Sequence, residues 1–192
     1  MKVNDKLNLV IPITEGPPVV SAFHTPISRE VFEANYRILA ATKASLASKG
    51  LHYQAVTGPQ IAALALKEEG RKEAEAHDAD GDAGATQLLE EMKRLTVVLA
   101  PGDQGWDKLP VEAAINADVI DKEDWEEVAA QLVFFTCHYW LTKKSDRRGM
   151  MDTTASLLDA SVTHFTVTDY CDSLRTSTKD ADSTRKTSSV PS

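Results

Sequence analysis

The chain has 192 residues, of which 42% are hydrophobic, and it carries a formal net charge of −8 with a pI near 5.1. This length suits one domain with a sizeable core, and the acidic balance argues against a nucleic-acid partner, because phosphate contacts need a clustered basic face. No apolar run reaches the length of a signal or a membrane span, and two cysteines are too few for a secreted disulfide framework, so we expect a cytoplasmic protein without a membrane partner.

The first elements predicted along the chain are two short strands. Apolar residues alternate over Leu7–Ile13, a breaker run follows at residues 15–18, and a second apolar run covers Val19–Phe23. This pattern is typical of a two-stranded β element around a turn.

Helical spacing of apolar residues predicts the next three elements. The first helix starts within residues 25–28 and ends at a glycine C-cap, Gly50. A second helix opens at residues 57–59 and presents an apolar face. A third is capped by Thr86 and ends at residues 97–99, before a run of breakers.

The strongest predicted helix follows the loop at residues 100–106 and a short helical piece that begins at Pro110. Asp121, with Asp124 three residues later, resembles an acid-capped helix start at the positive end of the helix dipole. From residue 131 to residue 141 the helix is apolar on most sides, yet this run is too short for a membrane span. We expect it to be the central core element.

The C-terminal part of the chain consists of a predicted helix, a segment of mixed pattern and a Ser/Thr-rich tail. A last long helix is predicted from Met150 to Ser161, before a mixed segment over residues 162–174. The twenty residues 173–192 contain ten Ser or Thr, and so few apolar side chains cannot offset the entropy of ordering them. The predicted fold class is therefore mainly α: a helical domain over residues 1–172 with a short N-terminal two-stranded β element, and a disordered Ser/Thr-rich tail over residues 173–192.

The most tempting local motif is an acidic run that resembles the start of a helix-loop-helix calcium site. Asp78, Asp80 and Asp82 occupy alternate positions, as in such a loop. The sixth and twelfth loop positions should be glycine and glutamate, but they are Ala83 and Leu89. We therefore favour a flexible acidic loop over a metal site.

The cysteines and histidines form no recognisable catalytic group. Cys137 and His138 are adjacent on a helix, so their side chains point about 100° apart, and Cys137 is predicted to be a buried thiol. Cys171 with His164 and Asp169 could be drawn as a triad, but the segment borders the predicted tail and lacks rigid support. We interpret these residues as structural.

The sequence also contains no clear motif for binding a nucleotide or another ligand. The glycines fit no phosphate-binding loop, which argues against nucleotide hydrolysis. Trp125 and Trp140 have the helical spacing of core residues, whereas Trp106 in its loop fits either a core or a ligand pocket. The basic run at residues 143–148 follows a helix end, where cations are favourable.

Because the sequence contains no clear catalytic motif, the order of its short segments is the most informative pattern. The segments are Met1–Leu7, Ile11–Pro12, Pro26–Phe32, Gly58–Pro59, Ala62–Leu64, Met92–Thr96 and Val133–Thr136, and the chain ends with Ser173–Thr178 and Ser188–Ser192. In the order and composition of these segments the chain resembles the tail assembly chaperones of long-tailed bacteriophages, the lambda-like minor tail protein family. The resemblance spans most of the chain and lies in no single diagnostic motif.

The resemblance implies a non-enzymatic helical protein of the host cytoplasm that needs no cofactor. Such a protein binds the tape measure protein, keeps its long hydrophobic helices from aggregating, and recruits tail tube subunits, with self-association as an option. In related phages a ribosomal frameshift near the end of the gene appends a second domain, to which residues 173–192 would be the linker. The family has no partner-binding motif, so no catalytic, cofactor-binding or metal residue is assigned.

Two other classes of protein stay open. A structural head-to-tail or minor tail component would persist in the finished virion. A small metal-dependent or thiol enzyme would use Asp78, Asp80 and Asp82, or Cys137 and Cys171.

Overall fold

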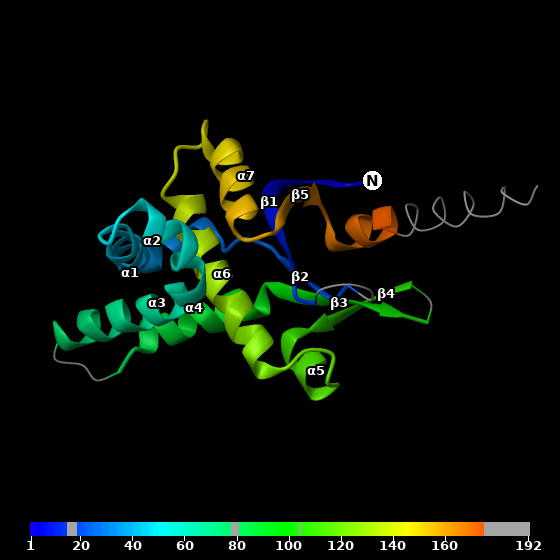
Figure 1. The fold of residues 1–192 in the computed structure, drawn as a ribbon, viewed down its shortest axis with the longest axis horizontal. Coiled ribbons are helices and arrows are strands. Elements are labelled where there is room, and N and C mark those ends of the chain that lie inside the picture. The colour runs from blue at the N-terminus through cyan, green and yellow to red at the C-terminus, as the bar shows by residue number, and fades with distance from the viewer. Residues whose placement is uncertain (15–18, 78–80, 104, 175–192) are drawn as a thin grey trace, which may run out of the picture.

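The fold combines one antiparallel sheet with a group of helices (Figure 1). The computed structural model describes residues 1–14, 19–77, 81–103 and 105–174. The strands are β1 (Val3–Pro12), β2 (Ser21–His24), β3 (Thr96–Gly102), β4 (Gly105–Pro110) and β5 (Ser161–Phe165). The helices are α1 (Arg29–Ala47), α2 (Leu51–Val56), α3 (Gly58–Glu75), α4 (Ala83–Arg94), α5 (Val111–Asn116), α6 (Lys122–Trp140) and α7 (Arg147–Leu157). Residues 167–174 are also helical.

The prediction of a mainly α fold with only a short N-terminal β pair is wrong. The strands β1 and β2 do pair antiparallel, with Ile11 opposite Ala22, but they belong to a five-stranded sheet in the order β4-β3-β2-β1-β5. All four pairings in this sheet are antiparallel. The architecture is therefore α+β, with β2 at the centre of the sheet and β3, β4 and β5 supplied by later parts of the chain.

The three strands that were not predicted from the sequence lie where the spacing of apolar residues fits more than one kind of element. Residues 97–99 were expected to end a helix, but they lie in β3, with Val98 opposite Ala22 of β2. A short apolar run of this length suits a buried strand as well as a helix end, so periodicity alone cannot decide between them. The chain then reverses into β4, with Gly102 opposite Gly105, and β5 occupies residues expected to be mixed.

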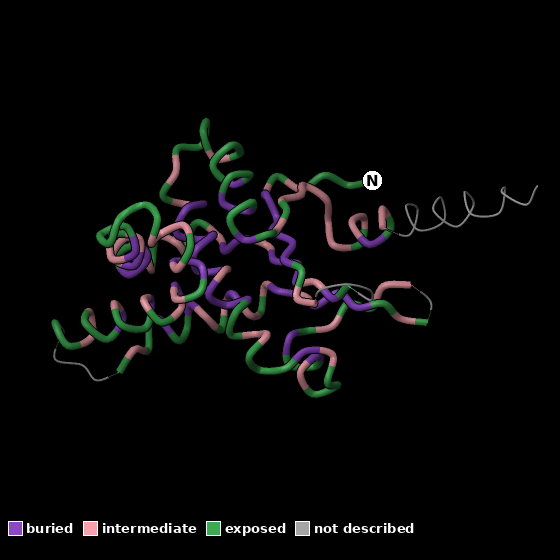
Figure 2. The backbone as a smooth tube through the Cα atoms, in the orientation of Figure 1, coloured by how far each residue is buried: buried purple, intermediate pink, exposed green. Residues whose placement is uncertain are grey.

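Side chains of the sheet alternate between two covered faces. Leu9 and Ile11 face the helices and join the main apolar cluster, in which Phe135 of α6 lies. Val10 and Phe23 face the opposite way and pack with residues of the helical segment 167–174. Figure 2 shows the buried positions gathered where α6 meets the sheet. The 167–174 segment thus covers the face of the sheet opposite α6.

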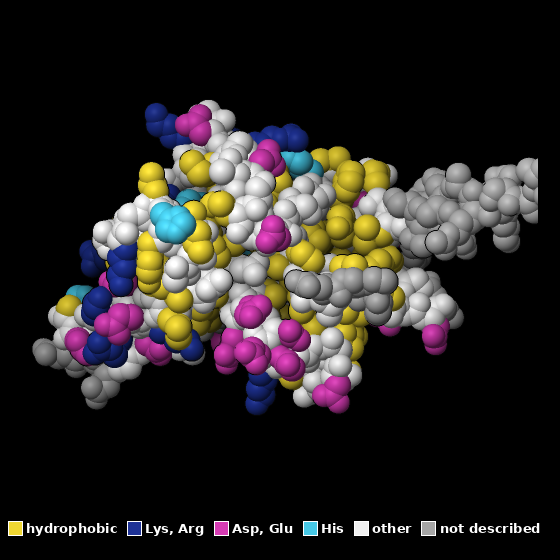
Figure 3. Space-filling model, viewed as in Figure 1, with side chains coloured by type: hydrophobic (Ala, Val, Ile, Leu, Met, Phe, Trp, Pro, Cys, Tyr) yellow, Lys and Arg dark blue, Asp and Glu magenta, His cyan; other side chains and the backbone are white. Residues whose placement is uncertain are grey.

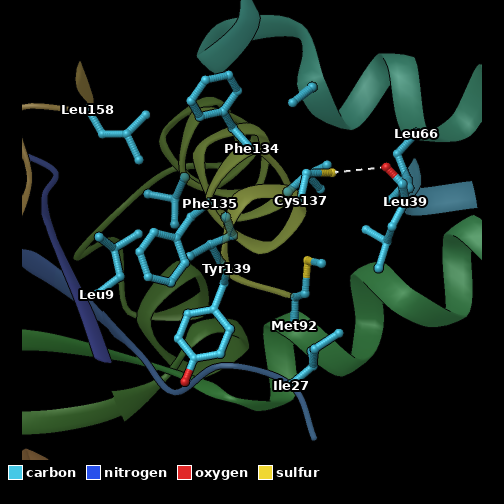
Figure 4. Packing of buried hydrophobic residues seen from close by; sticks show 14 of the residues in the cluster. Leu9, Ile27, Leu39, Leu66, Met92, Phe134, Phe135, Cys137, Tyr139 and Leu158 are labelled. Carbon is cyan, nitrogen blue, oxygen red and sulfur yellow. Dashed lines mark hydrogen bonds between the residues drawn. The ribbon is translucent and has the colours of Figure 1, made fainter. Parts of the chain in front are cut away.

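Helix α6 is the central core element, as predicted. Its start is a capping box: the Asp121 carboxylate accepts from the Asp124 N–H, and the Asp124 carboxylate accepts from the Asp121 N–H, both at 2.8 Å. Every residue from Val128 to Tyr139 except Gln131 is buried. Figure 4 shows side chains of α6 pointing toward β1 on one side and toward α1 and α3 on the other. Within the described ranges, no helix has the length and apolarity needed to cross a membrane.

The other predicted helices are present with shifted ends. Ser28 caps α1 by accepting from the Val31 N–H at 3.2 Å, and α3 begins at Gly58. Thr86 is not a cap, because α4 already begins at Ala83. The last long helix, α7, begins and ends a few residues before the predicted bounds. Helix α2 was not predicted.

The predicted tail falls almost entirely on residues that the structure does not describe. The described chain is helical to residue 174, so the helix crosses the expected boundary at residue 173. Residues 175–192 lie outside the described residues. The disordered tail stays a prediction from composition.

Candidate partner-binding surface

The thiol of Cys137 lies in the core. Its residue is fully buried, and its Sγ donates to the Leu39 carbonyl oxygen at 3.5 Å, as drawn in Figure 4. Burial raises the pKa of this thiol to about 12, because desolvation disfavours the thiolate. A nucleophilic cysteine needs the opposite shift, so the geometry fits the predicted structural role.

The three residues that could be drawn as a triad are placed in different surroundings. Cys171 is buried in the apolar cluster on the second face of the sheet. The Asp169 carboxylate accepts hydrogen bonds from the Thr166 hydroxyl at 2.7 Å and from the Lys2 N–H at 2.8 Å. His164 Nδ1 lies 3.4 Å from the main-chain oxygen of Asn4. The carboxylate is thus held by a hydroxyl and a main-chain amide rather than by an imidazole.

The acidic run is only partly described. Asp78 and Asp80 lie outside the described residues. Asp82 immediately precedes α4, and its Oδ1 accepts from the Thr86 hydroxyl at 2.9 Å. The rest of the described chain brings together no group of three or more His, Cys, Asp or Glu side chains that could hold a metal ion.

The three tryptophans are packed against apolar clusters. Trp125 and Trp140 are half-buried against the main cluster, and Trp140 stacks on Phe32 with ring centroids 5.5 Å apart. Arg147, from the predicted basic run, lies over Trp140 at 5.0 Å. Trp106 lies in β4 and packs against the cluster on the second face of the sheet. This contact fits the core alternative for Trp106.

The feature that distinguishes the surface of the described residues is a short helix, α2, with exposed apolar residues at both of its ends. Helix α2 contains no buried residue, and Leu51 and Val56 are 84% and 56% exposed. Leu64 of α3 is 66% exposed. We call these three side chains, Leu51, Val56 and Leu64, the α2 surface. Figure 3 shows apolar side chains gathered over α2 and the first half of α3, at the left of the view.

A polar contact anchors α2 against the core helix. His138 of α6 is buried, and its Nδ1 lies 2.8 Å from the Phe134 carbonyl oxygen, to which a protonated Nδ1 donates. Its Nε2 then accepts from the Gln54 amide at 3.4 Å. Burial lowers the pKa of His138, which keeps the imidazole neutral and able to accept. Gln54 therefore faces inward, and the apolar residues at the two ends of α2 face outward.

The sequence pattern gave only a faint signal for this surface. Residues 51–56 lie between Gly50, expected as a C-cap, and the Gly58–Pro59 start of the next helix. Six residues are too few for a helical period to stand out. No protein-family model, curated protein or solved structure matches this chain, so the surface is interpreted from its own residues.

Proposed function

We propose that this protein is a tail assembly chaperone of a long-tailed bacteriophage. It is a non-enzymatic protein that binds the tape measure protein and helps to recruit tail tube subunits in the host cytoplasm. The observation that carries the proposal is the α2 surface, because a protein that shields apolar helices needs an apolar face of its own that the fold leaves open. The identity of the partner comes from the resemblance of the sequence segments alone, because the α+β fold departs from the helical protein that the resemblance implied.

The size of the α2 surface suits a reversible contact. Burying one large aliphatic side chain contributes about 1.5–3 kcal/mol relative to leaving it exposed. Three such side chains give on the order of 5 kcal/mol, from which the entropy of association must be subtracted. A contact of this strength holds a client and releases it when the tube subunits polymerise around it.

Co-expression with the tape measure protein of the same genome tests the proposal. The tape measure protein alone is expected to be insoluble, and it should become soluble and co-purify when this chain is present. The triple variant Leu51→Ser, Val56→Ser and Leu64→Ser should lose most of this effect. Its circular dichroism should match the wild type and its melting temperature should fall by no more than about 5 °C, because exposed substitutions change stability by only about 0.5 kcal/mol each.

A matched control removes an equal number of exposed apolar side chains elsewhere. Leu141, Met150 and Leu157, near and within α7, are 37%, 41% and 45% exposed. Their serine triple variant should rescue the tape measure protein as well as the wild type does. Equal loss in both variants would argue against a specific surface, and no rescue by the wild type would overturn the proposed function. A stoichiometric amount of this chain in purified virions would instead identify a structural tail component.

A further inference from the structure

The chain segment that carries the α2 surface is poor in acidic residues. The whole chain carries 29 acidic and 21 basic residues, so a stretch of 34 residues would hold about five acids if they were evenly spread. Residues 34–67, which include most of α1, all of α2 and the first half of α3, hold no Asp or Glu. They contain Arg37, Lys43, Lys49 and Lys67. The α2 surface therefore sits in a cationic part of an acidic protein.

Within the part of the chain that the structure describes, the lysines of this stretch form no ion pair, whereas cations on either side of it do. Arg29 pairs with Glu33 at 2.7 Å, and Lys72 pairs with Glu69 at 2.8 Å. Among the described residues, Lys43, Lys49 and Lys67 form no ion pair. Their ammonium groups are therefore not held in an ion pair by the described part of the fold and can pair with a partner.

The position of these lysines follows the apolar side chains. Lys67 lies one helical turn after Leu64 on α3, and both line one shallow hollow. Arg71, Glu68 and Asp82 line the same hollow, and Arg71 is paired with Glu68. Lys49 lies two residues before Leu51, with its Nζ 5.2 Å from the ring centroid of Tyr53 of α2. Figure 3 shows Lys and Arg side chains, with some Asp and Glu among them, along the border of the apolar area. One exposed lysine thus lies close to each end of the α2 surface.

A third lysine lies deeper in the same region. Lys43 of α1 is half-buried near Cys137 and His138, and burial lowers the pKa of its ammonium group because the charged form is desolvated. A carboxylate brought close by a partner would stabilise that charge. The three lysines together favour a partner that carries negative charge beside its apolar side chains.

We propose that the α2 surface binds an amphipathic helix whose apolar stripe is flanked by Asp and Glu. The apolar stripe covers Leu51, Val56 and Leu64, and the flanking carboxylates pair with Lys49 and Lys67. This inference rests on the proposed function and adds the chemistry that selects the segment of the client. Attraction between opposite charges speeds encounter and disfavours basic segments, whereas the apolar contact supplies most of the affinity.

A helix fits this surface better than an extended strand. The surface consists of side chains on two consecutive helices, and it offers no open strand edge with which an extended peptide could pair. A helix satisfies its own main-chain hydrogen bonds and needs only side-chain contacts to dock.

Synthetic peptides test the charge selection directly. The probe is a 20-residue helical peptide with a leucine stripe flanked by glutamates, and the comparison peptide has lysine in place of each glutamate. By fluorescence anisotropy at low salt, the glutamate peptide should bind about tenfold more tightly than the lysine peptide. The preference should shrink as salt rises, because exposed charges are screened.

Charge-reversal variants of the protein test whether Lys49 and Lys67 cause the preference for the glutamate peptide. The double variant Lys49→Glu and Lys67→Glu should lose or reverse the preference for the glutamate peptide. The control variant Lys143→Glu and Lys144→Glu changes two exposed lysines that follow α6 and should keep it. Equal affinity for both peptides, or an unchanged preference in the Lys49 and Lys67 variant, would overturn the inference.

The outcomes separate this inference from the proposed function. If the wild type keeps the tape measure protein soluble but shows no charge preference, charge selection is wrong and the chaperone function stands. If the glutamate peptide binds at the α2 surface but the tape measure protein is not rescued, the charge selection stands and the proposed client is wrong.

Discussion

His24 is the buried residue with the clearest consequence for stability. Its side chain is fully buried in β2, with Nδ1 3.0 Å from the Thr96 hydroxyl oxygen. That hydroxyl donates to the Met92 carbonyl at 2.7 Å, so Nδ1 carries the proton and donates to it. Burial, reinforced by the charge of Lys6, lowers the pKa of His24 to about 3. The imidazole stays neutral in the folded protein at any pH near neutrality.

The shifted pKa predicts weaker folding in mild acid. The unfolded chain binds a proton at this histidine near pH 6.5, whereas the folded chain binds it only near pH 3. Stability from this group is therefore complete above pH 6.5 and is lost as the pH falls toward 3. Between pH 7 and pH 5 the loss from this group alone should be about 2 kcal/mol, measured by urea denaturation.

Variants assign that pH dependence to His24. His24→Gln should lower stability at pH 7 but flatten its decline toward pH 5. His77→Gln, which removes an exposed imidazole, should leave the decline as it is in the wild type. An identical decline in His24→Gln and the wild type would show that other groups carry the pH dependence.

Cys137 should be protected from reagents in the folded state. Its burial and raised pKa leave almost no thiolate at neutral pH. In a Cys171→Ala background, Ellman's reagent should modify Cys137 only as fast as the protein unfolds, and at once in denaturant. Rapid labelling of the native protein would contradict the assignment of a core thiol and reopen the thiol enzyme.

At the scale of elements, sequence patterns identified helices better than strands. The capping box at Asp121 and the apolar run of α6 are local signals, and both were confirmed. Strands β3 and β5 pair with the N-terminal strands far away in the chain, and β4 pairs only with β3, so their short runs could be assigned only after the sheet was known. The α2 surface was not predicted, because the exposure of its side chains depends on how α2 packs against the rest of the fold. The sequence of α2 alone does not determine that packing.

The packing of α3 against α1 and α4 depends on a glycine. A Cβ at Gly70 would lie 2.9 Å from the Ala85 Cβ and 3.0 Å from the Ile38 Cδ1. Gly70→Ala should therefore cost about 1–3 kcal/mol in overpacking, partly offset by about 1 kcal/mol of helix propensity. The net effect measured by denaturation should be destabilising.

The same substitution in an uncrowded helix is the control. A Cβ at Gly149 of α7 would meet no atom within 4 Å. Gly149→Ala should therefore stabilise the protein by about 0.5–1 kcal/mol. A stabilising Gly70→Ala would mean that the three helices are packed less tightly than the structure describes.

At the scale of the whole molecule, we expect the C-terminal residues to be dispensable for folding. The composition of residues 175–192, which lie outside the described residues, predicts a tail that contributes nothing to the fold. Deleting Thr176–Ser192 should leave helicity and melting temperature unchanged and should weaken only a function that needs an appended domain. A large loss of helicity would show that these residues belong to the core.

The whole molecule also has an uneven distribution of charge. The α2 surface lies in a cationic stretch, whereas the short span from Asp121 to Glu127 around the start of α6 is strongly acidic. An amphipathic acidic client would be attracted to the first region and repelled by the second. The fold thus offers one side of the molecule to such a client.

Hydrogen–deuterium exchange of the complex with the tape measure protein tests this account most directly. We predict slower exchange on binding in residues 49–67, which carry the α2 surface, with little change in β4 or α7. The serine triple variant at Leu51, Val56 and Leu64 should lose that protection. Protection confined to other elements, with residues 49–67 unchanged, would contradict the assignment of the α2 surface as the client-binding site.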